Sequence, residues 1–523
     1  MIQINSLAKP LKIGKIELKH RLVQGPMWSR FCTADGEVTQ QMIDYYSARA
    51  KGGAAMIVIE STAVDSRYVW DMATLRLDET KMVPAYARLV KEIHLHGIPA
   101  VAQLINVGST SANPISPSGV PSVMHGMVGI INSRAMTLED IEEQREKFIK
   151  TAVLAKEAGC DGILIHAATS YLLHQFLSPY TNKRTDQYGG STENRLRLPV
   201  EIIRGIRKKC GSDLVIGFEI VADELLGDRG LTLDETVKMA LMLEKEGIDY
   251  LDTMVGTYET FATSELSPGH SKYTRFGAWH QTQAYKEVIK IPVVHRAQGD
   301  YDPNSWEKHV AAGDADIVQI AKPSLCDPDI YNKVIKGNLE DIRECTCSCN
   351  CLDNQILWHY VVECELNPEL GKECIYAIQK VEKPKKVLVV GAGPGGLETA
   401  RVAALRGHDV TVIDKEAEAG GKLRYANLCV DNEPYGKFRD WEVKRCKEAG
   451  VKFEFGKEAT SDTIQNANPD AVVLAYGAQE RVVPDIPGIN KPHVVSPEDV
   501  LTGKVKVGQK VVIFGGNRVG VDT

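Results

Sequence analysis

The sequence has no long apolar segment and no strong excess of one charge. No stretch of about eighteen consecutive apolar residues occurs in the 523 residues, so we expect no membrane-spanning helix. The amino terminus, MIQINSLAKPLKIGK, lacks the apolar core of a secretory signal, which predicts a cytoplasmic protein with reduced thiols. The formal net charge of -7 argues against a bulk attraction to nucleic acid or anionic membranes.

Internal repeats and low-complexity tracts are also absent, which argues against a solenoid or a disordered chain. The chain is too long for one hydrophobic core and suggests about two to four domains.

Short apolar runs alternate with amphipathic segments through the first 340 residues. Helical patterns follow the runs, for example over residues 137–157 and 233–246. This alternation is typical of βα units, and eight of them predict an α/β fold of the (β/α)8 TIM-barrel type. The eight runs are RLVQGPMW, AAMIVIES, IPAVAQLI, GILIHAA, LVIGFEI, YLDTMVG, IPVVHRA and DIVQIAK.

Polar and aromatic residues stand where these runs end. The chemistry of a TIM barrel lies at the carboxyl ends of its strands, so these residues are the first candidates for a site. They are Pro26, Met27, Trp28, Glu60, Gln103, residues 166–171, Glu219, residues 296–298 and Lys322.

Five of the twelve cysteines lie within twenty residues, between the two halves of the chain. Four of them share one loop, and the fifth follows after twelve intervening residues. This spacing suits a metal cluster better than disulfides, although a structural zinc site and unliganded thiols remain alternatives. The five are Cys345, Cys347, Cys349, Cys351 and Cys364.

The second half opens with a glycine-rich fingerprint. The run VLVVGAGPGG, residues 387–396, predicts a strand that enters a helix through GxGxxG, and Asp414 ends the next apolar run. This combination is typical of a dinucleotide site, and residues 472–478 resemble the second FAD-contact motif of disulfide-reductase-like modules. The candidate FAD site comprises Gly391, Gly393, Gly396, Asp414, Lys415, Gly421, Ala475 and Gly477.

A second fingerprint, GGNRVG at residues 515–520, would begin an NAD(P)-type subdomain from about residue 508. The preceding run, residues 511–514, is expected to be its first strand. Asn517 replaces the middle glycine, and a side chain there crowds a pyrophosphate, so NAD(P)H binding stays open. The sequence stops at Thr523, just after this turn, and we expect it to be incomplete.

The motif HAATSYLLHQFLSP at residues 166–179, followed by NKRTDQYGGSTENR at residues 182–195, closely resembles the Old Yellow Enzyme flavoproteins. The whole chain resembles their multi-cofactor branch, which contains dienoyl-CoA reductase, 2-enoate reductase and trimethylamine dehydrogenase. This resemblance implies an FMN-binding barrel over residues 1–340, a 4Fe-4S segment and linker over 341–383, and a Rossmann-like FAD domain over 384–523. It also implies a homo-oligomer.

The resemblance assigns roles to the motif. His166 matches the residue that hydrogen-bonds an electron-withdrawing carbonyl, and Tyr171 matches the proton donor to the α-carbon. This pairing is chemically sound, because hydride addition at the β-carbon leaves enolate charge on the oxygen. Thr169 stands where the family has Asn or His, and its shorter hydroxyl is a third catalytic candidate.

The resemblance also implies the FMN site. Pro26, Met27, Gln103, Gln298 and Lys322 match positions that line the isoalloxazine or hold the phosphate. Trp28 occupies a position beside flavin N5 and O4, where many relatives use Thr or Cys.

Glu219 replaces an Arg near flavin N1. An anion there, at ~4 Å, would lower the flavin potential by roughly 50 mV after screening and make the flavin a stronger hydride donor. The alternative is a Glu219 that is protonated or paired with Arg296.

The cluster pattern of the relatives is Cys-x2-Cys-x2/3-Cys-x11/12-Cys. Cys345, Cys351 and Cys364 match its outer positions, while Ser348 occupies the middle one. Either Cys347 or Cys349 is expected to substitute, and the sequence does not choose between them.

The resemblance therefore implies a reductase that passes electrons through FAD and a 4Fe-4S cluster to FMN, then hydride to a carbonyl-conjugated ring or alkene. The two departures at Trp28 and Glu219 favour a demanding acceptor, an aryl-CoA thioester such as 2-naphthoyl-CoA. A ferredoxin-like protein is a candidate electron donor. The alternatives are an enoyl-CoA, 2-enoate or steroid enone reductase, an amine dehydrogenase of the trimethylamine-oxidising type, and an electron-transfer protein without a substrate.

Overall fold

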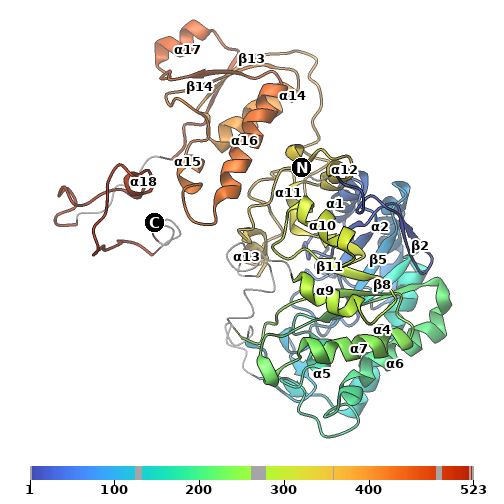
Figure 1. Cartoon of the computed structure of the whole chain (residues 1–523). Helices are drawn as coiled ribbons and strands as arrows, with labels where there is room; N and C mark the ends of the chain where they lie inside the picture. The colour runs from blue at the N-terminus through green and yellow to red at the C-terminus, as the bar shows by residue number, and fades with distance from the viewer. Residues whose placement is uncertain are drawn as a thin grey trace. The chain divides into compact units, whose positions relative to one another are not determined.

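The computed structural model describes residues 3–123, 132–260, 278–356, 358–478, 486–516 and 520. The chain divides into two compact units, Met1–Ile375 and Tyr376–Thr523, which are described in turn (Figure 1).

Eight parallel strands form a closed barrel in the first unit. Each predicted run supplies one strand, so the (β/α)8 prediction is confirmed. Around the barrel the strands follow chain order, and β12 pairs with β3 to close the ring. They are β3 (Leu22–Gln24), β4 (Ile57–Ala63), β5 (Ala100–Ile105), β8 (Gly162–Ala167), β9 (Val215–Val221), β10 (Tyr250–Met254), β11 (Val293–Arg296) and β12 (Ile317–Ile320).

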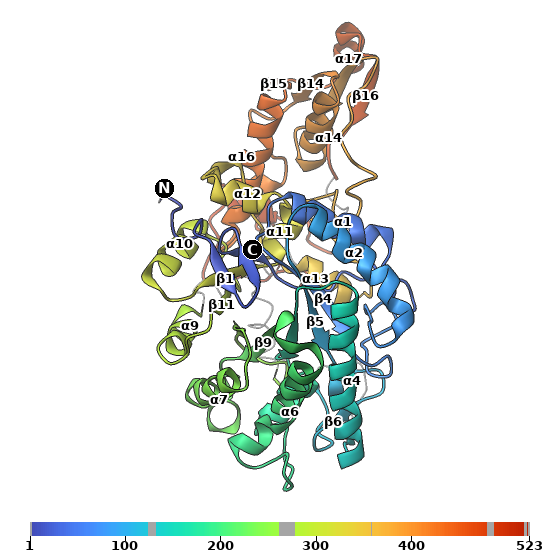
Figure 2. The ribbon, with the colours of Figure 1, turned by 90° about the vertical axis from the view of Figure 1, so that its right-hand side faces the viewer.

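Helices surround the strands, as Figure 2 shows for α2, α4, α6 and α7. The expected helix at 137–157 is α4, which begins after Thr137 because the Thr137 hydroxyl and the Asp140 carboxylate form a capping box. The helices of the first unit are α1 (Gln40–Lys51), α2 (Val83–Leu95), α4 (Leu138–Glu157), α5 (Leu172–Leu177), α6 (Thr192–Cys210), α7 (Leu233–Lys245), α9 (Trp279–Lys286), α10 (Pro303–Ala312), α11 (Lys322–Cys326), α12 (Ile330–Ile335) and α13 (Asn350–Ile356).

An amino-terminal hairpin, β1 (Leu11–Ile13) and β2 (Ile16–Leu18), closes the barrel at the amino ends of its strands. Its apolar side chains pack against residues from the first halves of the strands, including Val23, Val101 and Leu164. Burying these side chains removes apolar surface from water and leaves the carboxyl ends of the strands as the open end. A short parallel pair, β6 (Ile115–Ser116) and β7 (Arg134–Ala135), lies in the loop after β5.

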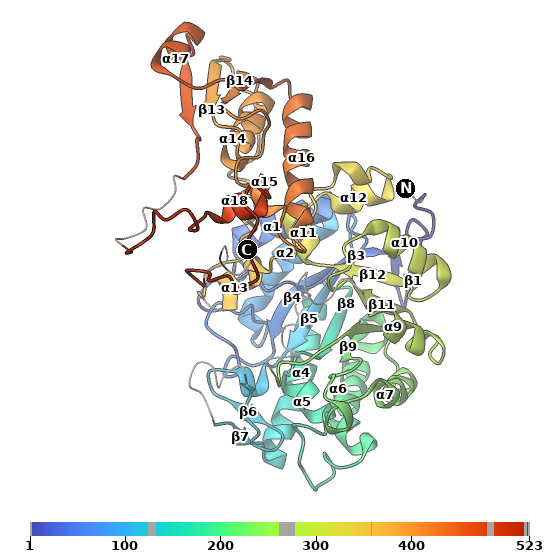
Figure 3. The same ribbon diagram turned by 60° about the vertical axis from the view of Figure 1, so that its left-hand side comes forward.

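The second unit is a four-stranded parallel sheet in the order β15-β14-β13-β16. Helices α14 and α16 pack together on one face, and α17 covers the other (Figure 3). The elements are β13 (Lys386–Val390), α14 (Pro394–Leu405), β14 (Asp409–Asp414), α15 (Leu423–Ala426), α16 (Glu433–Glu448), β15 (Lys452–Phe455), α17 (Ser461–Ala467), β16 (Ala471–Leu474) and α18 (Pro497–Leu501).

The prediction of a strand at residues 511–514 is wrong. This segment pairs with none of the strands in the described ranges, and Val512 and Phe514 are 95% and 80% exposed. An apolar run becomes a parallel strand only beside a neighbour that takes its backbone hydrogen bonds. Asn517 lies outside the described residues. Of the helices that the structure describes, none is both long and apolar enough to cross a membrane.

The glycine fingerprint gives a test of packing in the second unit. A Cβ on Gly396 would lie 1.9 Å from the Gly391 carbonyl oxygen, whereas a Cβ on Gly395 would have no atom of the described residues within 4 Å. Gly396→Ala should therefore destabilise the unit by about 1 to 3 kcal/mol, while Gly395→Ala should change its stability by less than about 0.5 kcal/mol. Thermal unfolding followed by circular dichroism would compare them, and equal midpoints would contradict the prediction.

Candidate functional site

Buried polar side chains meet inside the barrel. Gln103 on β5 donates its Nε2 to Glu219 Oε2 on β9 at 2.6 Å. Arg296, at the end of β11, places its Nη2 2.9 Å from Glu219 Oε1 and 3.4 Å from Asp252 Oδ2 on β10. Both carboxyl groups are fully buried, and Gln319 on β12 also donates to Asp252 Oδ2, at 2.8 Å.

Glu219 is therefore not a lone carboxylate, because it is paired with Arg296. The guanidinium is shared between two carboxyl groups, so the trio carries a net negative charge when both are ionised. Burial raises the pKa of Asp252 to about 7, against the opposing effect of Arg296. Of the two alternatives for Glu219, the structure thus favours a side chain paired with Arg296 over a lone anion.

His166 and Tyr171 lie together at this end of the barrel, with ring centroids 5.0 Å apart. His166 Nδ1 accepts the Ala168 N–H at 3.2 Å, so a neutral ring carries its proton on Nε2, which lies 3.5 Å from Glu219 Oε1. Burial lowers the pKa of His166 and raises that of Tyr171, each well away from its usual value. The site therefore holds a neutral imidazole donor and a protonated phenol.

The loop between them has a strained backbone. Thr169 and Ser170 have φ angles of 58° and 59°, in the left-handed region that favours glycine. The Ser170 hydroxyl lies 2.7 Å from Thr257 Oγ1 and accepts the Tyr258 N–H at 3.0 Å, which fixes the loop. Thr169 Oγ1 donates to the Met254 sulfur at 3.2 Å. A thioether is a weak acceptor, so a substrate carbonyl could replace it.

A row of aromatic rings continues from Tyr171. The Trp70 ring centroid lies 5.1 Å from that of Tyr171 and 4.7 Å from that of Trp28. The indole of Trp28 donates to the Ala73 carbonyl at 3.2 Å, and the Arg30 guanidinium lies over it at 5.2 Å. Sequence reasoning missed Trp70. Its signal was a tryptophan in the loop that follows β4 at the carboxyl end of the barrel.

The other residues predicted to hold FMN have mixed surroundings. Met27 is buried in the core beyond β3, Pro26 beside it is partly buried, and Gln298 Oε1 accepts the Val255 N–H at 3.2 Å. Lys322 Nζ donates to Cys349 Sγ at 3.3 Å.

The carboxyl end of the barrel nevertheless suits a polar ring system such as the isoalloxazine of FMN. Among the described residues, Asp252 Oδ1 and Arg296 Nε are buried and have no hydrogen-bond partner, and such atoms call for a bound group or water.

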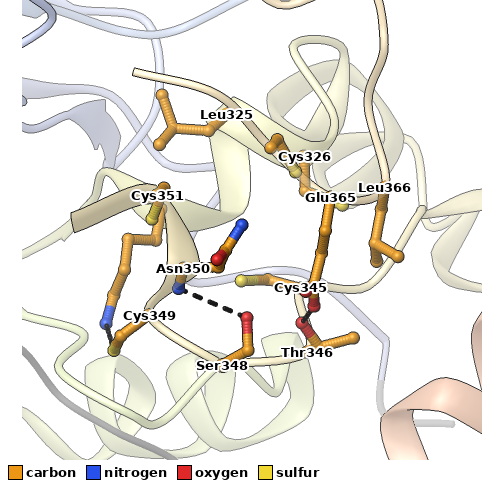
Figure 4. Close-up of a pocket in the computed structure, with 12 residues that line it drawn as sticks. Leu325, Cys326, Cys345, Thr346, Ser348, Cys349, Asn350, Cys351, Glu365 and Leu366 are labelled. Carbon is orange, nitrogen blue, oxygen red and sulfur yellow. Dashed lines mark hydrogen bonds between the residues drawn. The ribbon is translucent and has the colours of Figure 1, made fainter. Parts of the chain in front are cut away.

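The cysteine segment forms a hollow of about 330 Å³, part of it open to solvent (Figure 4). Four of the predicted cysteines line it, and Cys347 does not. The Cys347 thiol is directed at the Cys345 carbonyl at 3.9 Å instead. Among the described residues, no group of three potential ligands could hold a single metal ion. The lining cysteines are Cys345, Cys349, Cys351, Cys364 and, in addition, Cys326.

Cys326 was missed by sequence reasoning. It lies on α11, and a hydrogen bond with it lowers the pKa of the Cys364 thiol to about 7 despite burial. Its spacing from Lys322 could have revealed it, because Cys326 follows Lys322 by four residues and the two share one face of a helix. A donor set of thiols around one hollow suits an iron-sulfur cluster.

The glycine loop of the second unit suits a dinucleotide. The Ala392 N–H donates to Asp414 Oδ2 at 2.6 Å, and a Cβ on Gly391 would meet the Ala475 carbonyl oxygen at 2.4 Å. A Cβ on Gly393 would meet only Gly421, at 4.0 Å, which leaves the amino end of α14 open to a phosphate. Of the remaining candidates, Lys415 is exposed, and Gly477 has a φ of 81°.

A buried carboxyl group supports the loop that carries Trp28. Glu60 on β4 is fully buried, and its Oε2 accepts the Ser29 N–H at 3.1 Å. Burial raises the pKa of Glu60 from 4.5 to about 7. The folded chain thus holds this proton at a pH where the unfolded chain has released it, so stability falls as the pH rises between the two values.

Glu60→Gln should remove this loss. We expect the variant to gain about 1 to 3 kcal/mol over the wild type at about pH 8 and little at about pH 5. Thermal unfolding at both pH values measures the difference. Glu157→Gln, at the exposed end of α4, is the matched control and should show no such dependence. A gain of equal size at both pH values would contradict the assignment.

Comparison with known proteins agrees with this architecture. Residues 6–341 match the NADH:flavin oxidoreductase / NADH oxidase family, and residues 385–523 match the pyridine nucleotide-disulphide oxidoreductase family. The chain is 36% identical to an NADH oxidase from Thermoanaerobacter brockii over 98% of its own length and 79% of the relative. It is 31% identical to a cinnamate reductase from Clostridium sporogenes, covering 100% of this chain and 81% of the relative.

Among solved structures, a complex of 2-naphthoyl-CoA reductase with 2-naphthoyl-CoA superimposes with a TM-score of 0.94. It is 31% identical, and the match covers 99% of this chain and 81% of that one. The barrel and the glycine loop thus correspond to an FMN domain and an FAD module. The chain belongs to the NADH:flavin oxidoreductase / NADH oxidase family, the Old Yellow Enzyme flavoproteins, and is a multi-cofactor flavin oxidoreductase of their enoate-reductase type.

Proposed function

We propose that the protein reduces a carbonyl-conjugated aromatic ring or alkene, and that its substrate is an aryl-CoA thioester of the 2-naphthoyl-CoA type. The observation that carries this proposal is the pair of neutral acids at the barrel end, the His166 imidazole and the Tyr171 phenol, with ring centroids 5.0 Å apart.

The two side chains suit the two atoms of the substrate that change in the reaction, the carbonyl oxygen that gains charge and the α-carbon that gains a proton. When bound, FMN would supply the hydride, and FAD and a 4Fe-4S cluster would supply its electrons. His166 has its Nε2 proton free of the Ala168 contact, so it can donate to the carbonyl oxygen that gains enolate charge. Tyr171 stays protonated because burial disfavours the phenolate, and it can give its proton to the α-carbon.

The aromatic row favours a flat substrate. Trp28, Trp70 and Tyr171 present successive rings within about 5 Å of each other, a surface on which an aryl group can stack. The similarity to a reductase solved with 2-naphthoyl-CoA supports an aryl thioester. The similarity to a cinnamate reductase supports a conjugated carboxylate as the second candidate.

We further propose Cys345, Cys349, Cys351 and Cys364 as the four ligands of a 4Fe-4S cluster. All four line the hollow, whereas Cys347 is not part of its lining. This choice favours Cys349 over Cys347 and over Ser348 as the replacement for the missing middle cysteine.

An anaerobic activity screen tests the substrate class. Aryl-CoA, enoyl-CoA, cinnamate, enone and amine substrates would be assayed with a reduced one-electron donor and with NAD(P)H. We expect turnover of 2-naphthoyl-CoA and a loss of roughly 100- to 10,000-fold in its rate of reduction in Tyr171→Phe, because the phenol proton is missing. Reduction of the bound flavin by the donor should be unchanged in this variant. Turnover confined to amines would overturn the proposal.

The buried trio should set the flavin potential. Glu219→Gln removes a negative charge and should raise the FMN midpoint potential by roughly 30 to 50 mV. Arg296→Gln removes the neutralising cation and should lower it. Spectroelectrochemical titration of the two variants measures these opposite shifts, and shifts of the same sign would show that the trio does not act through its charge.

A further inference from the structure

Helix α11 presents two side chains to the cysteine hollow. It begins at Lys322, two residues after the end of strand β12, and ends at Cys326. Residues four apart lie on the same face of a helix, and both side chains line the hollow with the predicted ligands. Lys322 is 8% exposed and Cys326 is fully buried, so the two groups face the hollow rather than water.

Each of these side chains contacts a different ligand sulfur. Lys322 Nζ donates to Cys349 Sγ at 3.3 Å. Cys326 lines the same hollow as Cys364, from the other end of the cysteine segment, and acts on the Cys364 thiol as a hydrogen-bond donor. The helix thus supplies a cationic donor to one ligand and a thiol donor to a second.

The chain on either side of the cysteines fixes α11 in this position. Arg343, two residues before Cys345, donates its Nε to the Cys326 carbonyl at 2.8 Å. Asn367, three residues after Cys364, donates its Nδ2 to the Leu325 carbonyl at 2.8 Å. Both donors are buried, so both ends of the cysteine segment are attached to the helix that carries Lys322 and Cys326.

We propose that Lys322 and Cys326 are positioning residues that raise the reduction potential of the 4Fe-4S cluster by hydrogen-bonding its ligands Cys349 and Cys364. This inference rests on the cluster of the proposed function. A reduced cluster carries one more negative charge than an oxidised one, and donors to the ligand sulfurs stabilise that charge. The ammonium group adds a full positive charge within the same buried site.

Redox titration of the holoenzyme tests this role, with the cluster followed by electron paramagnetic resonance. We expect Lys322→Met to shift the ratio of reduced to oxidised cluster at fixed potential by roughly tenfold or more, which corresponds to a fall of about 59 mV for one electron. Lys322→Arg keeps a cationic donor and should restore most of the shift. Cys326→Ala should lower the potential, whereas Cys326→Ser keeps a donor and should not.

Iron, sulfide and flavin content separate the possible outcomes. Loss of iron from Cys326→Ala would overturn the inference by making Cys326 a ligand. Loss of FMN from Lys322→Met with an unchanged cluster potential would overturn it, because Lys322 would then bind the FMN phosphate and have no effect on the cluster. Wild-type protein without iron and sulfide would overturn the cluster itself, and with it this inference. Lys336→Met, at the exposed end of α12, is the charge control and should leave the potential unchanged.

Discussion

The hydrogen bonds between β12 and β3 close the barrel, and the site depends on this closure. In a closed ring of parallel strands, side chains from different strands share one interior, and the carboxyl ends of all strands open on one side. Glu219, Asp252 and Arg296 lie on three consecutive strands, with the two carboxyl groups fully buried and the guanidinium partly buried. Their charges are therefore balanced mainly by one another. The Glu219–Arg296 pair forms only when the barrel brings these strands together.

The barrel and the cysteine site share one short peptide. Strand β12 contributes Gln319 to the polar interior, and α11, which begins three residues after Gln319, contributes Lys322 to the cysteine hollow. A second link runs through α13, because Gln355 donates to the backbone carbonyl of Trp28. The aromatic row and the cysteine segment are thus fixed to each other within the first unit, which suits a path for electrons between two centres.

Sequence reasoning predicted what local pattern determines. Eight apolar runs predicted eight strands, and Thr137 predicted the start of α4. Both features depend on residues that are neighbours in the sequence. His166 and Tyr171 were found together because they are five residues apart in one motif that runs from β8 into α5. The partners of Glu219, Lys322 and Cys364 come from other strands and helices, so they depend on a register that no local pattern contains. The run at 511–514 shows the converse, since an apolar pattern forms no strand without a neighbour.

The attachment of α11 restricts how this part of the chain can vary in length. Lys322 and Cys326 share one helical face only at their present spacing, since an added residue would rotate one of them by about 100° around the helix axis. Arg343 and Asn367 bind carbonyls of the same turn, so they would lose their acceptors as well. Insertions are therefore far easier to accommodate in the loops of the open barrel end than between β12 and the cysteines.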